Sequence, residues 1–168
     1  MKQSPPEQNA TTVRRATRAD AEELLTLIDA LAAYEKLEPP DAAAKERLLT
    51  DMSGDRPRFE AFLAEVDGRA VGYAFVLETY SSFLAMPTLY LEDIFVLPEW
   101  RSRKVGFTLF AAMAAEAYRR GCGRMEWTVL DWNRLAIDFY ERLGAQHLKE
   151  WHYYRLGREA LRSFADPT

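Results

Sequence analysis

The sequence predicts a single α/β domain, and three local patterns support this fold class. An apolar run over 89–97 stops at a proline and leads through a basic turn into a helix near Val105, which indicates a strand followed by a helix. The dipeptide Asp67-Gly68 joins two apolar runs, and both of its residues suit the positive φ angles of a tight hairpin. Apolar residues after Thr17 recur at spacings of three and four, as on one face of a helix.

Length and composition fit one soluble globular domain. The chain has 168 residues, of which 48% are hydrophobic and 29% charged. Its formal net charge of -4 argues against nucleic acid as the main partner, because no long basic run offsets it. A neutral or cationic substrate fits this charge better.

Neither a signal peptide nor a membrane span is predicted. Residues 1–12 are polar and lack the apolar core of a signal peptide, so we expect a flexible tail followed by one domain over 13–168 of a cytoplasmic protein that does not enter the membrane. Cys122 is the only cysteine, which excludes an intramolecular disulfide. Its position between two glycines favours a turn residue over a nucleophile.

The first elements are one strand and two helices. A strand over 13–16 precedes a helix whose N-cap is Thr17 with Asp20 as its acidic partner, and Asp41 caps a second, short helix. The first helix carries apolar residues on one face, which we expect to pack on a sheet: Leu24, Leu27, Ile28, Leu31 and Tyr34.

The predicted hairpin consists of strands over 59–66 and 69–79. The stretch 80–88 then indicates a longer connection before the central strand at 89–97. Its apolar residues either cover the core or form part of a substrate mouth: Phe83, Leu84 and Met86.

After the basic turn, helices and strands are expected to alternate along the chain. In chain order we expect a helix from Val105 to Gly121, a strand over 124–130, a helix capped by Asp131 or Asn133 and ended by Gly144, one or two strands over 145–156, and a terminal helical turn over 158–164.

The basic turn lies at the start of a helix. The first amide groups of a helix have no partner within it, and the helix dipole is positive there, so an anion is favoured at this position. Gly106 allows a ligand to approach the backbone. The alternative is an ordinary connection with solvated basic residues: Arg101, Arg103 and Lys104.

Two adjoining segments resemble the acetyl-CoA-binding region of the GCN5-related N-acetyltransferases (GNAT). They are Leu91-Glu92-Asp93-Ile94-Phe95-Val96 and Arg101-x-x-Lys104-Val105-Gly106. The family pattern is Arg/Gln-x-x-Gly-x-Gly/Ala, so Lys104 replaces the middle glycine. The resemblance implies the GNAT fold: a mixed, mostly antiparallel sheet of six to seven strands, flanked by about four helices and splayed between the central strand and the next.

Further segments resemble the diamine (spermidine/spermine) and thialysine acetyltransferase branch of this family. They are Tyr34-Glu35-Lys36-Leu37, Leu89-Tyr90-Leu91-Glu92-Asp93, Val129-Leu130-Asp131-Trp132-Asn133 and Phe139-Tyr140-Glu141-Arg142-Leu143-Gly144-Ala145. The resemblance therefore implies transfer of an acetyl group from acetyl-CoA, without a metal, to a primary amine of a small molecule by direct attack.

The reaction requires a proton acceptor for the amine and a proton donor for the CoA thiolate. The resemblance assigns deprotonation, through water, to Glu92 and the donor role to Tyr140, whose phenol stays protonated below a pKa of about 10. The alternatives are that Glu92 only caps or pairs near a strand bulge and that Tyr140 is a core aromatic. Adjacent residues of a strand point to opposite faces, so only a bulge would bring both Glu92 and Asp93 to the site.

The resemblance also implies the contacts of both substrates. The expected acetyl-CoA contacts are Ile94, Phe95, Val96, Arg101, Ser102, Arg103, Lys104, Val105, Gly106, Phe107, Asn133, Arg134, Leu135, Ala136 and Tyr140. The expected amine contacts are Tyr34, Glu35, Glu92, Asp93, Glu126 and Trp127. Alternatively, Asn133 is only a cap, Glu35 a solvated helix end and Trp127 a core residue.

The resemblance further implies a homodimer, in which the aromatic residues near the C-terminus contribute to the interface: Trp151, Tyr153 and Tyr154. His152 lies where the branch usually has an acidic residue, which weakens the case for a polyamine substrate. Two other functions remain open from the sequence: acetylation of a protein lysine or N-terminus, and a CoA-binding dimer without turnover.

Overall fold

The computed structural model describes residues 10–165, which divide into two parts, one up to Thr128 and one from Val129. The predicted flexible tail over 1–12 lies mostly outside the described residues. That the chain forms one domain over 13–168 stays a prediction.

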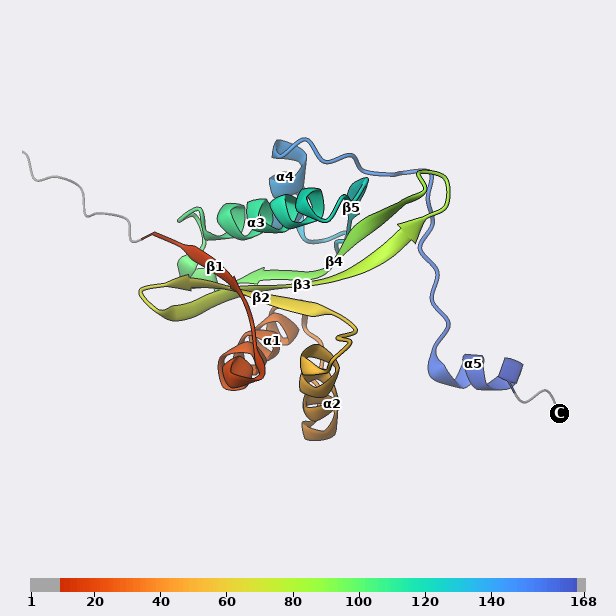
Figure 1. The fold of residues 1–168 in the computed structure, drawn as a ribbon, viewed down its shortest axis with the longest axis horizontal. Helices are drawn as coiled ribbons and strands as arrows, with labels where there is room; N and C mark the ends of the chain where they lie inside the picture. The colour runs from red at the N-terminus through yellow and green to blue at the C-terminus, as the bar shows by residue number, and fades with distance from the viewer. Residues whose placement is uncertain (1–9, 166–168) are drawn as a thin grey trace, which may run out of the picture. The chain divides into compact units, whose positions relative to one another are not determined.

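The first part is a five-stranded sheet with helices on both faces (Figure 1). The strand order is β1-β2-β3-β4-β5, antiparallel except for the parallel β4–β5 pair. Its elements are β1 (Thr12–Arg15), η1 (Arg18–Asp20), α1 (Ala21–Glu35), α2 (Ala42–Ser53), β2 (Glu60–Val66), β3 (Arg69–Ser81), β4 (Met86–Val96), η2 (Pro98–Trp100), α3 (Val105–Arg119) and β5 (Arg124–Glu126).

The sheet divides the first part into two cores. Tyr73 and Phe75 of β3 pack with the buried residues of α1 and α2, whereas Ala74 and Val76 pack with those of α3. Figure 1 shows the same division, with α1 and α2 on one face of the sheet and α3 on the other. The alternation follows from the two-residue period of a strand. The predicted mixed, mostly antiparallel sheet with flanking helices is confirmed.

Local signals in the sequence are confirmed where side chain and backbone agree. Asp41 caps α2, since its carboxylate accepts a hydrogen bond from Ala44 N at 2.7 Å. Asp67 and Gly68 have φ angles of 53° and 73°, and they connect Val66 to its partner Arg69 in a two-residue turn.

The prediction of a long connection over 80–88 is wrong. β3 continues to Ser81, which pairs with Met86, so the two strands form one long hairpin. Side chains near its tip are exposed, among them Phe83, which is 100% exposed. The apolar residues of this stretch therefore do not cover the core. Near such a tip, the alternation of buried and exposed residues along a strand is lost, so the sequence pattern does not indicate the strands there.

The last strand of the sheet is shorter than predicted. β5 ends at Glu126 instead of residue 130, and its ladder with β4 covers only Thr88, Leu89 and Tyr90. Along 91–96, β4 therefore has no strand partner on this side within residues 10–165. This is the predicted splay beside the central strand.

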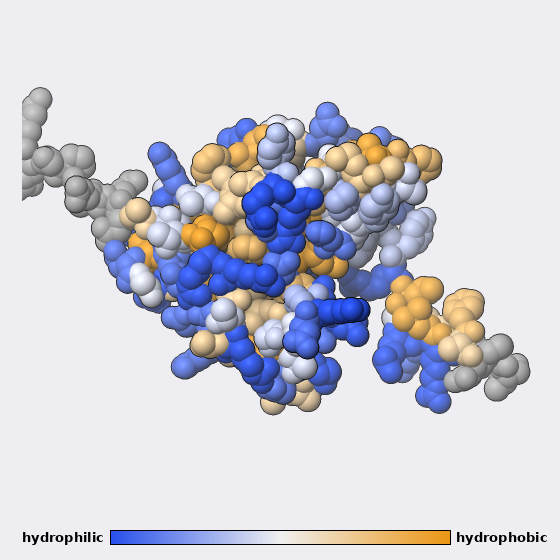
Figure 2. Space-filling model, in the orientation of Figure 1, coloured by the Kyte–Doolittle hydropathy of each residue, from blue (hydrophilic) through white to orange (hydrophobic). Residues whose placement is uncertain are grey.

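The second part contains α4 (Arg134–Arg142) and α5 (Arg158–Ala165). Asn133 is the cap of α4, because its side chain accepts a hydrogen bond from Ala136 N at 3.2 Å. Gly144 follows the helix with a φ of 84°. The predicted terminal helical turn is confirmed as α5, whose surface exposes hydrophobic residues beside hydrophilic ones (Figure 2).

The predicted strands over 145–156 are not formed in the described residues. The backbone bonds found there are local, from Lys149 N to the His147 carbonyl and from Trp151 N to the Leu148 carbonyl. A strand requires a ladder to a neighbour, which residue types alone do not reveal. Residues 10–165 therefore contain five strands and five α-helices, instead of six to seven and about four.

Candidate active site

A β-bulge in β4 brings two carboxylates to one position. Phe75 of β3 pairs with Asp93, but the next residue, Val76, pairs with Leu91, so Glu92 is the extra residue of β4. A bulge re-aims side chains that a regular strand would send to opposite faces. Glu92 is exposed and Asp93 is half-buried. The sequence had required such a bulge for both residues to act together.

Asp93, Glu92 and Glu35 form an acidic group. The pKa of Asp93 is raised to about 6, chiefly by burial and further by the negative charges of Glu92 and Glu35, against a lowering effect of the hydrogen bond from Tyr73. That bond runs from the Tyr73 hydroxyl to Asp93 Oδ2 at 3.2 Å. Glu35 is the last residue of α1, and burial raises its pKa too. An arrangement of this kind can bind a cation and accept a proton near neutral pH.

Arg101 joins the acidic side of the site to the end of β4. Its Nε donates to the Val96 carbonyl at 3.0 Å, and its guanidinium lies 4.6 Å from the ring centroid of Tyr34 and 5.6 Å from that of Phe95. The side chain is thus held by protein groups. Sequence patterns do not reveal this contact, because Tyr34 and Arg101 are far apart in the chain.

The backbone of β4 is closely fitted on the β3 side and open on the other. A Cβ on Gly72 would lie 2.6 Å from the Phe95 carbonyl oxygen, so only glycine allows this approach of β3 to β4. Toward β5, the strand has no ladder over 91–96. Peptide groups on such an edge can pair with an extended ligand.

The basic turn, residues 101–104, has two residues in the left-handed region. Ser102 has a φ of 60° and Lys104 a φ of 64°. Lys104 therefore adopts the conformation for which the family pattern uses glycine. Ser102 adopts the same conformation, which the family pattern does not predict. Left-handed residues beside a helix start form concave arrangements of N–H groups that bind anions.

The start of α3 offers amide donors. The first hydrogen bond of the helix runs from Thr108 N to the Lys104 carbonyl at 2.9 Å, so the helix itself does not use the amides of residues 105–107. A Cβ on Gly106 would be in ordinary contact, 3.8 Å from Val96 Cγ2. Packing within the protein thus does not require glycine here, in keeping with room left for a ligand.

Two predicted amine contacts, Glu126 and Trp127, have other partners in the structure. Trp127 packs with the core on the α3 side, and its ring centroid is 5.4 Å from that of Phe110. Glu126 pairs with Tyr90 in the sheet and forms a 3.0 Å ion pair with Arg124. The electrostatics of Asp93 link Glu35, Glu92 and Asp93. The role of Glu126 and Trp127 in amine binding stays a prediction.

The remaining predicted residues belong to the second part. Tyr140 of α4 is buried, which raises the pKa of its phenol to about 12, so the hydroxyl is protonated at neutral pH. Arg134 forms an ion pair with Asp138 at 3.1 Å, Ala136 is half-buried and Leu135 is exposed. The imidazole of His152 is exposed, 6.4 Å from the ring of Tyr154.

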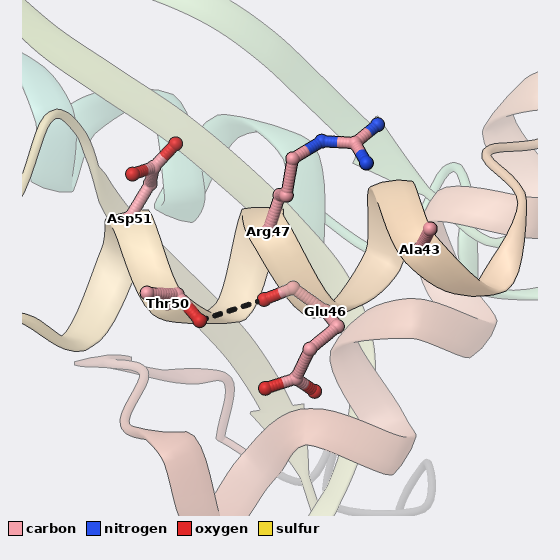
Figure 3. Close-up of a pocket in the computed structure, with 5 residues that line it drawn as sticks. All are labelled: Ala43, Glu46, Arg47, Thr50 and Asp51. Atoms are coloured by element: carbon pink, nitrogen blue, oxygen red, sulfur yellow. Dashed lines mark hydrogen bonds between the residues drawn. The ribbon is translucent and has the colours of Figure 1, made fainter.

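A hollow of about 440 Å³ lies elsewhere, on α2. Its lining residues all come from this one helix, and Figure 3 shows their side chains spreading along it without converging. The hydrogen bond drawn there, from Thr50 Oγ1 to the Glu46 carbonyl at 2.9 Å, lies within the helix. Because it contains none of the predicted site residues, this hollow is not a candidate active site.

Membrane spans and metal clusters are not found in the part of the chain that the structure describes. No helix among residues 10–165 has the length and apolar character to cross a bilayer. Within the same residues, no three His, Cys, Asp or Glu side chains are grouped as metal ligands. That the reaction proceeds without a metal stays a prediction.

Comparison with known proteins defines the class of this fold and site. The family model described as "Acetyltransferase (GNAT) family" matches residues 23–145, across both parts. The chain belongs to this family, and it is therefore an N-acetyltransferase of the kind that uses acetyl-CoA.

Individual relatives agree with this assignment. The chain is 36% identical over 164 residues to the thialysine N-epsilon-acetyltransferase of Bos taurus, covering 91% of this chain and 96% of the relative. It is 41% identical over 115 residues to the L-ornithine N5-acetyltransferase NATA1 of Arabidopsis thaliana, covering 67% and 50%. The structure of the aminoglycoside N-acetyltransferase AAC(6')-Iy in complex with CoA matches with a TM-score of 0.70 and 25% identity, covering 91% and 99%.

Proposed function

We propose that the protein transfers the acetyl group of acetyl-CoA to a primary amine of a small molecule, either a diamine or polyamine or a thialysine-like amino acid. The observation that supports it most is the acidic group, because two of its three carboxylates, Glu92 and Asp93, lie on the strand that leads into the basic turn. The relatives named for thialysine and ornithine acetylation support the same substrate class.

Acetyl-CoA binds in this proposal along β4 and the basic turn. The peptide groups of 94–96 pair with the pantetheine arm, except the Val96 carbonyl, which already accepts from Arg101. Amides of residues 102–107 bind the pyrophosphate, aided by the dipole of α3. Residues 133–136 flank the arm.

The amine must reach the thioester without its extra proton. A reference alkylamine has a pKa of about 10.4, so the neutral form at pH 7 costs about 4.6 kcal/mol. The acidic group binds the ammonium ion, and Glu92 takes its proton through a water molecule. Tyr34 adds an aromatic face for the cation.

The transfer itself forms one bond and breaks another. The amine nitrogen attacks the acetyl carbonyl carbon, and the tetrahedral intermediate collapses with loss of the C–S bond and departure of CoA as thiolate. Tyr140 donates its phenolic proton to the thiolate and regains one from solvent, while the second amine proton is released to solvent. The products are the N-acetyl amine, CoA with its thiol protonated, and one proton.

A substrate panel tests this function. The full chain is incubated with acetyl-CoA and, separately, with spermidine, ornithine, thialysine and a histone-like lysine peptide, and the free thiol of CoA is measured. We expect turnover of small amines, with a KM for them raised in Glu35→Gln and unchanged in Glu23→Gln, an exposed carboxylate on the same helix. Preference for the peptide, or no turnover of any amine, would overturn the proposal.

Acetyl-CoA binding is tested separately by calorimetry. Absence of any heat with acetyl-CoA or CoA contradicts the proposed site, whereas binding without turnover points to the non-catalytic alternative.

We also propose a cytoplasmic homodimer, on the resemblance to the diamine branch. Sedimentation of the purified chain distinguishes a dimer from a monomer, and fractionation of cells that express it tests the location.

A further inference from the structure

The ring of Tyr73 occupies a core position that the ring of a phenylalanine would also fill. It is 0% exposed, and its ring packs edge-on against Phe75 at 5.1 Å and lies 6.4 Å from the ring of Phe95. These contacts are apolar and do not use the hydroxyl. A buried hydroxyl is unfavourable unless it forms a hydrogen bond, so its presence in this core calls for a partner.

That partner is Asp93 of the acidic group. The Tyr73 hydroxyl donates a hydrogen bond to Asp93 Oδ2 at 3.2 Å. It is the hydrogen bond that the structure shows for the Asp93 carboxylate within residues 10–165. In the ladder, Tyr73 pairs with Phe95 and Phe75 with Asp93, so the donor and the acceptor lie diagonally across the two strands, directly beside the bulge at Glu92. The bulge therefore aims Asp93, and Tyr73 fixes it there.

We propose that Tyr73 is a positioning residue for amine acetylation, which orients Asp93 and stabilises its ionised form as the half-buried partner of the substrate ammonium ion. This inference rests on the proposed function. It adds to Glu92, the exposed proton acceptor, a second carboxylate whose charge depends on a residue that does not touch the substrate.

The charges around Asp93 set the direction of the expected effect. Glu92 from β4 and Glu35 from α1 disfavour its ionisation, and the Tyr73 hydroxyl from β3 favours it. Burial and the nearby carboxylates raise the pKa of Tyr73 far above its usual value, so Tyr73 remains a donor at every assay pH. Loss of its hydroxyl therefore raises the pKa of Asp93 further.

The first test is Tyr73→Phe, which keeps the ring and removes the hydroxyl. We expect the acidic limb of the pH profile of kcat/KM for the amine to move to higher pH by about one unit. Calorimetric affinity for acetyl-CoA should not change. Tyr80→Phe, at an exposed tyrosine of the same strand, is the matched control and should leave the profile in place.

The second test is the double variant with Asp93→Asn. If Tyr73 acts through Asp93, Tyr73→Phe has no further effect on kcat/KM once Asp93 is replaced. Two results would overturn the inference while the wild type still acetylates amines. The first is an acidic limb of the pH profile that does not move in Tyr73→Phe. The second is an equal effect of Tyr73→Phe on kcat/KM with and without Asp93. Failure of the proposed function is a different result, because the wild type then shows no amine turnover.

Discussion

The acidic group and the basic turn are built in different ways, although Glu92 and Asp93 lie close to the turn in the chain. The basic turn is local: four consecutive residues and the start of α3 provide its charges and amides. The acidic group depends on distant segments, with Glu35 from α1, Asp93 and Glu92 from the bulge of β4, and Tyr73 from β3 as the hydrogen-bond donor.

This difference gives one short segment two binding preferences. From Glu92 to Lys104 the character changes from acidic to basic, with the open edge of β4 between. In the proposed function, a cationic amine and an anionic cosubstrate are therefore drawn to opposite ends of this segment. Variants that affect one end and spare the other test this division.

The largest effect is expected from Tyr140, which belongs to neither end. Tyr140→Phe should lower kcat at neutral pH by about 100-fold or more, because the thiolate loses its proton donor. Acetyl-CoA affinity by calorimetry should be unchanged, and Tyr118→Phe, an exposed tyrosine of α3, serves as the control. An unchanged kcat would remove Tyr140 from this role.

Asp93→Asn should separate function from stability at the acidic end. The pKa of Asp93 in the folded chain, about 6, exceeds its ordinary value of 3.8, so the unfolded chain binds fewer protons between these two pH values. The stability due to Asp93 therefore falls as the pH rises through this window. At pH 7.5 the asparagine variant should therefore be more stable, by on the order of 2 kcal/mol, and it keeps an acceptor for Tyr73.

The same variant should lose amine binding, with a KM for the amine raised by about 10-fold or more. Urea unfolding at pH 7.5 and at pH 4 measures the stability, and the gain should shrink at the lower pH. A destabilised Asp93→Asn at pH 7.5 would contradict the buried charge.

Glu92→Gln should move the pH profile in the direction opposite to Tyr73→Phe. Removing the negative charge of Glu92 lowers the pKa of Asp93, so the acidic limb of kcat/KM moves to lower pH, and kcat falls because the proton acceptor is lost. Steady-state kinetics between pH 5 and 9 show both effects. If the limb stays in place, the acidic group does not control it.

The two ends also differ in how far the sequence predicts them. The strand, the basic turn and the start of α3 follow from neighbouring residues, and the structure agrees with them. The bulge at Glu92 and the Tyr73–Asp93 bond depend on the register of β3 against β4, which residue types do not specify. For the same reason, the predictions for the hairpin tip and for 145–156 are wrong, whereas Asp41 and Asn133 are confirmed as caps of α2 and α4. Thr17 precedes the short η1, and Asp20 is the N-cap of α1.

Lys104 gives the smallest expected effect and tests the basic end. A non-glycine residue with a φ of 64° is disfavoured by about 1 kcal/mol, so Lys104→Gly should raise the free energy of unfolding by up to this amount. Lys104→Ala removes the charge without relieving the backbone, so it should not stabilise the fold.

Both variants should weaken acetyl-CoA binding at low salt, and the loss should diminish at high salt because screening already reduces the contribution of an exposed charge. Calorimetry at two salt concentrations separates the charge of Lys104 from its conformation. Unchanged affinity in both variants would mean that the pyrophosphate is bound by the amides of the turn alone.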